Sequence, residues 1–77
     1  METGMLWCDE DNRTDLSTKI GRAAAYYVEK FGLRPNVCYV HPSQMPAQRR
    51  RRDGILVMAN SHLRPGHLWL GILSSSH

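Results

Sequence analysis

A single amphipathic helix, expected over residues 14–32, limits the folds open to this chain. Thr14 is predicted to be its N-cap, and Gly32 suits the left-handed residue that follows many helix ends. Gly21 interrupts the helix and costs about 1 kcal/mol relative to alanine, unless it lets a strand approach closely. The apolar residues recur at three- and four-residue steps and so share one side of the helix. They are Leu16, Ile20, Ala23, Ala24, Tyr27 and Phe31.

The two sides of this helix differ in polarity, which predicts its orientation. Ile20 and Tyr27 lie on the apolar side and are expected to be buried against a sheet. Lys19 and Lys30 are expected to be exposed on the other side. The helix can therefore cover one face of a sheet and no more.

Three segments after the helix are typical of strands. Residues 37–41 are rich in β-branched and aromatic residues, and residues 55–59 and 67–73 are nearly continuous apolar runs. Residues 5–8 form a candidate short edge strand. We therefore predict an α+β fold, with one helix on a mainly antiparallel three-stranded sheet and room for a short extra N-terminal strand. The 77 residues predict one small domain, with frayed termini at 1–4 and 74–77.

The second face of this sheet must meet the N-terminal segment, another copy of the chain, or a partner, because continuous apolar strands are buried on both faces. We assign Leu68 and Leu70 to the outward face, with Trp7 and Tyr26 as candidate aromatic anchors of an interface. The leading hypothesis is a non-enzymatic interaction module, either a homodimer or a domain docked on a larger protein partner.

Charge is divided unevenly along the chain. Residues 1–15 hold five acidic residues and one basic residue, whereas residues 16–77 hold nine basic residues and two acidic ones. Four consecutive arginines stand in a long polar loop, and guanidinium groups bind phosphates bidentately. A small nucleic-acid-binding protein is therefore the alternative function, although no aromatic residue interleaves with the run. The predicted contacts to an anionic partner are Arg49, Arg50, Arg51, Arg52, Arg34 and Arg64.

The cysteines and histidines do not predict a metal site. Cys38, His62 and His67 offer ligand atoms, with Cys8 as a further one, but their spacing matches no zinc motif. Strand alternation also places Cys38 and His41 on opposite faces. Two cysteines are too few for a disulfide-rich scaffold, so free thiols are expected, although the sequence leaves open whether the two are bonded.

No catalytic or cofactor motif appears in the sequence, so neither an enzymatic activity nor a cofactor is expected. A small metal- or thiol-dependent enzyme is the third hypothesis. No apolar run approaches the ~18 residues of a membrane helix, and no signal peptide is recognisable. A cytoplasmic location without membrane contact is therefore expected.

Overall fold

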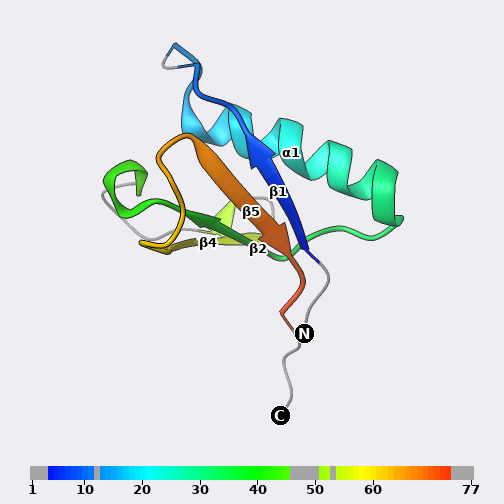
Figure 1. Ribbon diagram of the computed structural model, residues 1–77. Helices are drawn as coiled ribbons and strands as arrows, with labels where there is room; N and C mark the ends of the chain where they lie inside the picture. The colour runs from blue at the N-terminus through cyan, green and yellow to red at the C-terminus, as the bar shows by residue number, and fades with distance from the viewer. Residues whose placement is uncertain (1–3, 12, 46–50, 53, 74–77) are drawn as a thin grey trace.

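The computed structural model describes residues 4–11, 13–45, 51–52 and 54–73, with only the backbone described at 51 and 52. In this part of the chain one helix, α1 (Leu16–Phe31), packs on one face of a five-stranded sheet (Figure 1). The strands are β1 (Gly4–Cys8), β2 (Val37–Val40), β3 (Arg51–Arg52), β4 (Ile55–Ala59) and β5 (His67–Gly71), and a short 3-10 helix, η1 (Pro42–Gln44), follows β2. The predicted α+β fold, with its extra N-terminal strand, is confirmed.

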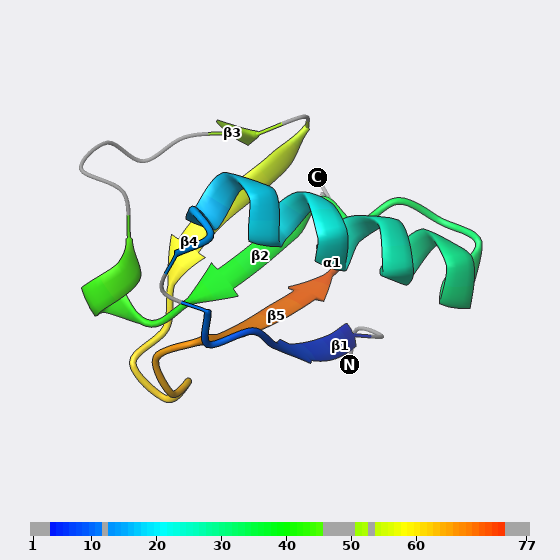
Figure 2. The same ribbon diagram turned by 90° about the horizontal axis from the view of Figure 1, so that it is seen from above.

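The strand order is β1-β5-β2-β4-β3, as Figure 2 shows from above the helix. The pairs β1/β5, β5/β2 and β4/β3 are antiparallel, whereas β2 and β4 are parallel. Parallel neighbours need a crossover of about a dozen residues, which explains the long connection between β2 and β4. Of the expected frayed ends, residues 1–3 and 74–77 lie outside the described residues, but Gly4 is paired with Gly71 inside the sheet.

The helix ends much as predicted and begins differently. Gly32 has a φ of 75°, and its N–H donates to the carbonyl of Val28 at 2.7 Å. The N-cap, however, is Asp15 rather than Thr14. The Thr14 hydroxyl donates instead to Oδ2 of Asp11 at 3.1 Å, so it is already used by the preceding turn. No described helix has the length and apolar character needed to cross a membrane.

The orientation of α1 is as predicted at three of four positions. Ile20 and Tyr27 are buried, with exposed fractions of 3% and 1%, and Lys30 is exposed. Lys19 is the exception, because it is 5% exposed. Its Nζ donates to the carbonyl of Asp9 at 2.9 Å, so its aliphatic stem is buried while the ammonium reaches the β1–α1 connection. Gly21 serves no close approach, since nothing lies within 4 Å of a Cβ placed there.

The outward assignment of Leu68 and Leu70 is corrected by the structure. Both side chains face α1 and are buried, with exposed fractions of 1% and 0%. They belong to a core in which alternate residues of β1, β5, β2 and β4 face the helix. The other sheet residues of that core are Met5, Cys38, Val40, Ile55 and Val57. The residues that alternate with these core positions in β1, β5, β2 and β4 form the opposite face, which we call the uncovered face because α1 lies on the other side (Figure 2).

Candidate functional site

A row of large side chains crosses four strands on the uncovered face. Leu6 of β1 is opposite Trp69 of β5, Trp69 is opposite Tyr39 of β2, and Tyr39 is opposite Met58 of β4. Leu6 is 58% exposed, and the other three are partly exposed. We call these four residues the cross-strand row. Backbone pairing places these side chains next to one another, so together they form an apolar and aromatic surface.

The aromatic centre of this row is fixed by its neighbours. The rings of Trp69 and Tyr39 lie 5.7 Å apart at 53°, a favourable tilted arrangement. The Trp69 indole also extends over Gly4, where any Cβ would collide with the ring. Gly4 is therefore required for Trp69 to lie across β1. The row is held in place before any partner binds.

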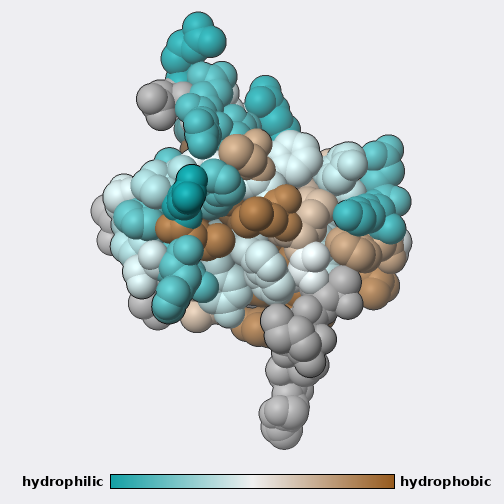
Figure 3. Space-filling model, in the orientation of Figure 1, coloured by the Kyte–Doolittle hydropathy of each residue, from teal (hydrophilic) through white to brown (hydrophobic). Residues whose placement is uncertain are grey.

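The strand positions around the row are uncharged. From β1 to β4, the described positions of the uncovered face carry no lysine, arginine, aspartate or glutamate. Figure 3, seen from the side where β1 forms the sheet edge, shows apolar surface over β1 and β5. The other residues of this face are Gly4, Cys8, Val37, Leu56, His67 and Gly71.

The two predicted aromatic anchors meet each other, but on the opposite side of β1. Trp7 faces the helix layer, and its ring lies 5.3 Å from that of Tyr26 on α1. Tyr26 is 49% exposed, whereas Trp7 is partly buried. The indole N–H of Trp7 is buried without a hydrogen-bond partner among the described residues. This pair thus closes the side of the core and does not extend the cross-strand row.

The predicted arginine contacts are divided between the two ends of β4. Arg49 and Arg50 lie outside the described residues, and Arg51 and Arg52 form β3 beside the start of β4. Arg34 comes near that same end, because it lines a groove of about 210 Å³ together with Ile55 and the α1 surface. Arg64 is exposed in the turn after the far end of β4, so it does not join the others.

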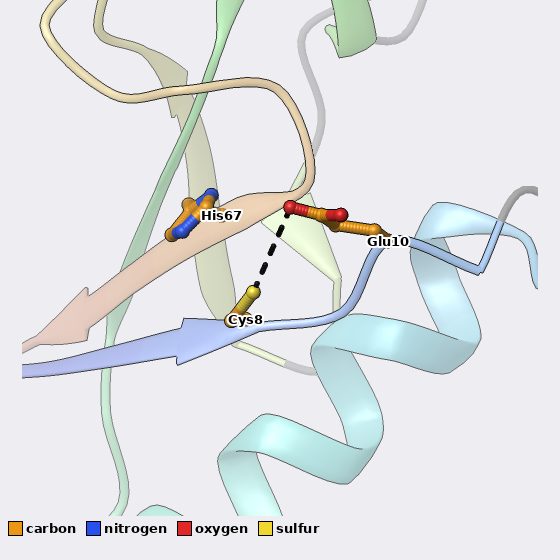
Figure 4. Close-up of side chains that lie close together, drawn as sticks. All are labelled: Cys8, Glu10 and His67. Atoms are coloured by element: carbon orange, nitrogen blue, oxygen red, sulfur yellow. Dashed lines mark hydrogen bonds between the residues drawn. The ribbon is translucent and has the colours of Figure 1, made fainter.

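A cluster of metal-ligand types stands at one corner of the uncovered face. Cys8 ends β1 and is directly opposite His67, the first residue of β5. Glu10 follows Cys8 in the connection to α1, and Oε2 of Glu10 accepts from Sγ of Cys8 at 4.0 Å (Figure 4). One ligand atom from each residue lies within 4.8 Å of the other two. We call these three residues the Cys8 cluster.

Of the weak metal candidates from the sequence, the structure brings only His67 and Cys8 together. His62 is exposed in the β4–β5 turn, away from this cluster in the described structure. Cys38 is buried on the helix side, and burial raises the pKa of its thiol to about 12. It therefore stays protonated and is a poor ligand. Cys8 and Cys38 are both free, on opposite faces of the sheet.

Glu10 was not among the predicted ligands. The sequence pattern that could have indicated Glu10 is its position two residues after Cys8, just beyond a candidate strand. The third residue of the cluster, His67, comes from the other end of the chain, so this pattern alone does not predict the site.

Comparisons with known proteins do not indicate what the cross-strand row or the Cys8 cluster does. No protein-family model matches the chain, and no curated protein or solved structure shows significant similarity to it.

Proposed function

We propose that this chain is a non-enzymatic interaction module that forms a homodimer through the uncovered face of its sheet. The observation that carries this proposal is the cross-strand row. Large apolar and aromatic side chains that are contiguous, partly exposed and fixed in position are typical of interface centres. Scattered exposed apolar residues would need no such explanation.

A second copy of the chain fits this face better than a charged partner. A twofold dimer places the same patch on both sides of the interface, so the patch must tolerate itself. The described positions from β1 to β4 carry no charge that would repel its counterpart, and two sheets stack face to face at about 10 Å. A chain of 77 residues also buries a smaller share of its surface than a larger domain does, so a dimer adds needed burial.

A cytoplasmic location, where thiols stay reduced, fits the two free cysteines.

The test is a pair of matched substitutions. Leu6 lies in the row and is 58% exposed, whereas Leu33 follows α1, outside the row, and is 61% exposed. We expect sedimentation equilibrium at high micromolar concentration to give the mass of two chains for the wild type and for Leu33→Glu. Leu6→Glu should give the mass of one chain, with the helix signal in circular dichroism unchanged.

Two outcomes would overturn the proposal. One is a wild-type chain that is folded and monomeric at that concentration. The other is equal behaviour of the two glutamate variants. If both are monomeric, the position of the apolar residue does not matter, and if both dimerise, the interface lies on another surface.

Nucleic-acid binding by the arginine segment is the second candidate function. The observation that favours it is the common location of β3 and Arg34 at the start of β4. Among the described strands, β3 is the outermost on its side of the sheet and pairs with β4. Phosphates could approach an arginine strand at such an edge without disturbing the core.

A further inference from the structure

We propose that Cys8, Glu10 and His67 form a zinc-binding site with three protein ligands. Thiolate, imidazole and carboxylate are the ligand types of protein Zn²⁺ sites, and three of them leave the fourth tetrahedral position open. Ca²⁺ and Mg²⁺ are bound by oxygen atoms alone, so a set that includes sulfur and nitrogen favours Zn²⁺. This proposal does not depend on dimerisation through the cross-strand row.

The distances suit such an ion. Zinc bonds of about 2.0–2.3 Å place tetrahedral ligand atoms roughly 3.3–3.8 Å apart. Sγ of Cys8 and Oε2 of Glu10 are 4.0 Å apart, and no pair in the cluster exceeds 4.8 Å. Closure needs movements of about 1 Å or less, which small rotations of exposed or partly exposed side chains provide.

The register of the sheet brings the cysteine and the histidine together. The N–H of Asp9 donates to the carbonyl of Gly66 at 2.8 Å, which makes Cys8 and His67 a pair without mutual backbone hydrogen bonds. Side chains at such pairs are closer than at hydrogen-bonded pairs. Two of the three ligands are therefore held by paired backbone, at the ends of two strands (Figure 4).

The third ligand is held by the turn before β5. Gly66 has a φ of 89°, and a Cβ on this residue would lie 2.7 Å from Cγ of Glu10. The absence of a side chain at Gly66 thus lets Glu10 lie over the turn. The Gly66 N–H donates to Oε1 of Gln44 at 2.8 Å, and Nζ of Lys19 holds the carbonyl of Asp9. Both segments that carry the ligands are tied to the rest of the fold.

A second observation, independent of the distances, points to a ligand. Nδ1 of His67 is buried and has no hydrogen-bond partner among the described residues. Buried polar atoms in native structures are nearly always satisfied, so an unsatisfied one calls for an explanation. One of the two ring nitrogens lies within the 4.8 Å limit of the cluster. A zinc ion bound through Nδ1 would take up its lone pair, and an ion bound through either nitrogen would fix the tautomer of the ring.

The test uses Zn²⁺ and Co²⁺ as probes on the reduced full-length chain. Competition with a chromophoric chelator should show one Zn²⁺ per chain, bound at micromolar concentration or tighter. Co²⁺ should give the visible bands of a tetrahedral site together with a thiolate charge-transfer band. Cys8→Ser should remove the charge-transfer band, and Glu10→Gln and His67→Gln should each weaken Zn²⁺ binding at least tenfold.

The matched control is His62→Gln, which changes an exposed histidine in the neighbouring turn and should leave the affinity unchanged. All three ligand side chains lie outside the core, so circular dichroism should show the helix intact in each variant. Zn²⁺ binding only at millimolar concentration, or a Co²⁺ spectrum without the thiolate band, would overturn the proposal. Equal loss of affinity in His62→Gln would overturn it as well.

Discussion

Gly66 and Gly21 show how differently two glycines act in this chain. Gly66 combines a left-handed backbone with the close approach of Glu10, so it has two reasons to lack a side chain. Gly21 has neither, because it lies within α1 and faces open space. Only the first glycine is required by the fold. Gly21 lowers the stability of the helix relative to alanine, and no contact in the fold requires it.

Gly21→Ala should therefore stabilise the protein. Alanine is favoured over glycine in helix interiors by about 0.5–1 kcal/mol, largely because it restricts the unfolded chain, and no atom blocks its methyl group here. Urea denaturation should show a higher midpoint with an unchanged slope. Gly66→Ala is the opposing control and should lower the midpoint. A loss of stability in Gly21→Ala would mean that another surface approaches the helix at this residue.

The elements could be predicted from sequence where their periodicity was clear. The spacing of apolar residues in α1 correctly predicted the burial of Ile20 and Tyr27. Residues 67–73 are nearly all apolar, so alternation could not show which side of β5 meets the helix. The pairing of Leu70 with Met5 and Cys38, which are distant in sequence, decides this. The prediction that Lys19 is exposed was wrong, because its ammonium group donates to a specific acceptor, the carbonyl of Asp9.

The same limit applies to the Cys8 cluster. The ligand types were visible, but the cluster exists because β1 and β5, the first and the last described strands along the chain, pair in one particular register. A shift of that register by one residue would turn His67 to the helix side. Local pattern does not determine register between strands so far apart in the chain, so the sequence did not combine Cys8 with His67.

β3 offers a prediction about the arginine segment. Replacement of Arg49, Arg50, Arg51 and Arg52 with serine should leave the fold intact, because β3 is a two-residue edge strand bound to β4 through its backbone. It should weaken binding to a labelled single-stranded oligonucleotide, measured by fluorescence anisotropy over a range of salt. The slope of log affinity against log salt should fall by about one per phosphate contact removed.

The matched control for this prediction is Arg64→Ser, at the other end of β4, which should change the affinity little. If the fourfold variant and the wild type bind with the same affinity and the same salt dependence, the arginine segment makes no contact with nucleic acid. That result would leave the dimer proposal untouched, since the cross-strand row contains no arginine.

In the part of the chain that the structure describes, α1 covers one face of the sheet and no second α-helix covers the other, where Val37 is nevertheless buried. The main core cluster is one layer of side chains between α1 and the sheet, and the cross-strand row lies on the other face of the sheet. A single layer of this kind supplies limited burial in a short chain. If two copies stack through their uncovered faces, each sheet gains a second apolar layer, and folding becomes linked to association.

This linkage predicts a melting temperature that depends on protein concentration. Above the dissociation constant, each tenfold rise in concentration favours the folded dimer by about 1.4 kcal/mol per dimer. For a domain of this size, that corresponds to a rise in melting temperature of roughly 3–6 °C. Thermal scans should be run in EDTA, so that metal binding at the Cys8 cluster does not contribute.

Leu6→Glu should melt at the same temperature at every concentration, because it removes the association, whereas Leu33→Glu should retain the wild-type dependence. The comparison separates the interface from general surface polarity, since the two leucines are similarly exposed, at 58% and 61%. A wild-type melting temperature that stays constant over a hundredfold range of concentration would show that the uncovered face is stable without a second copy.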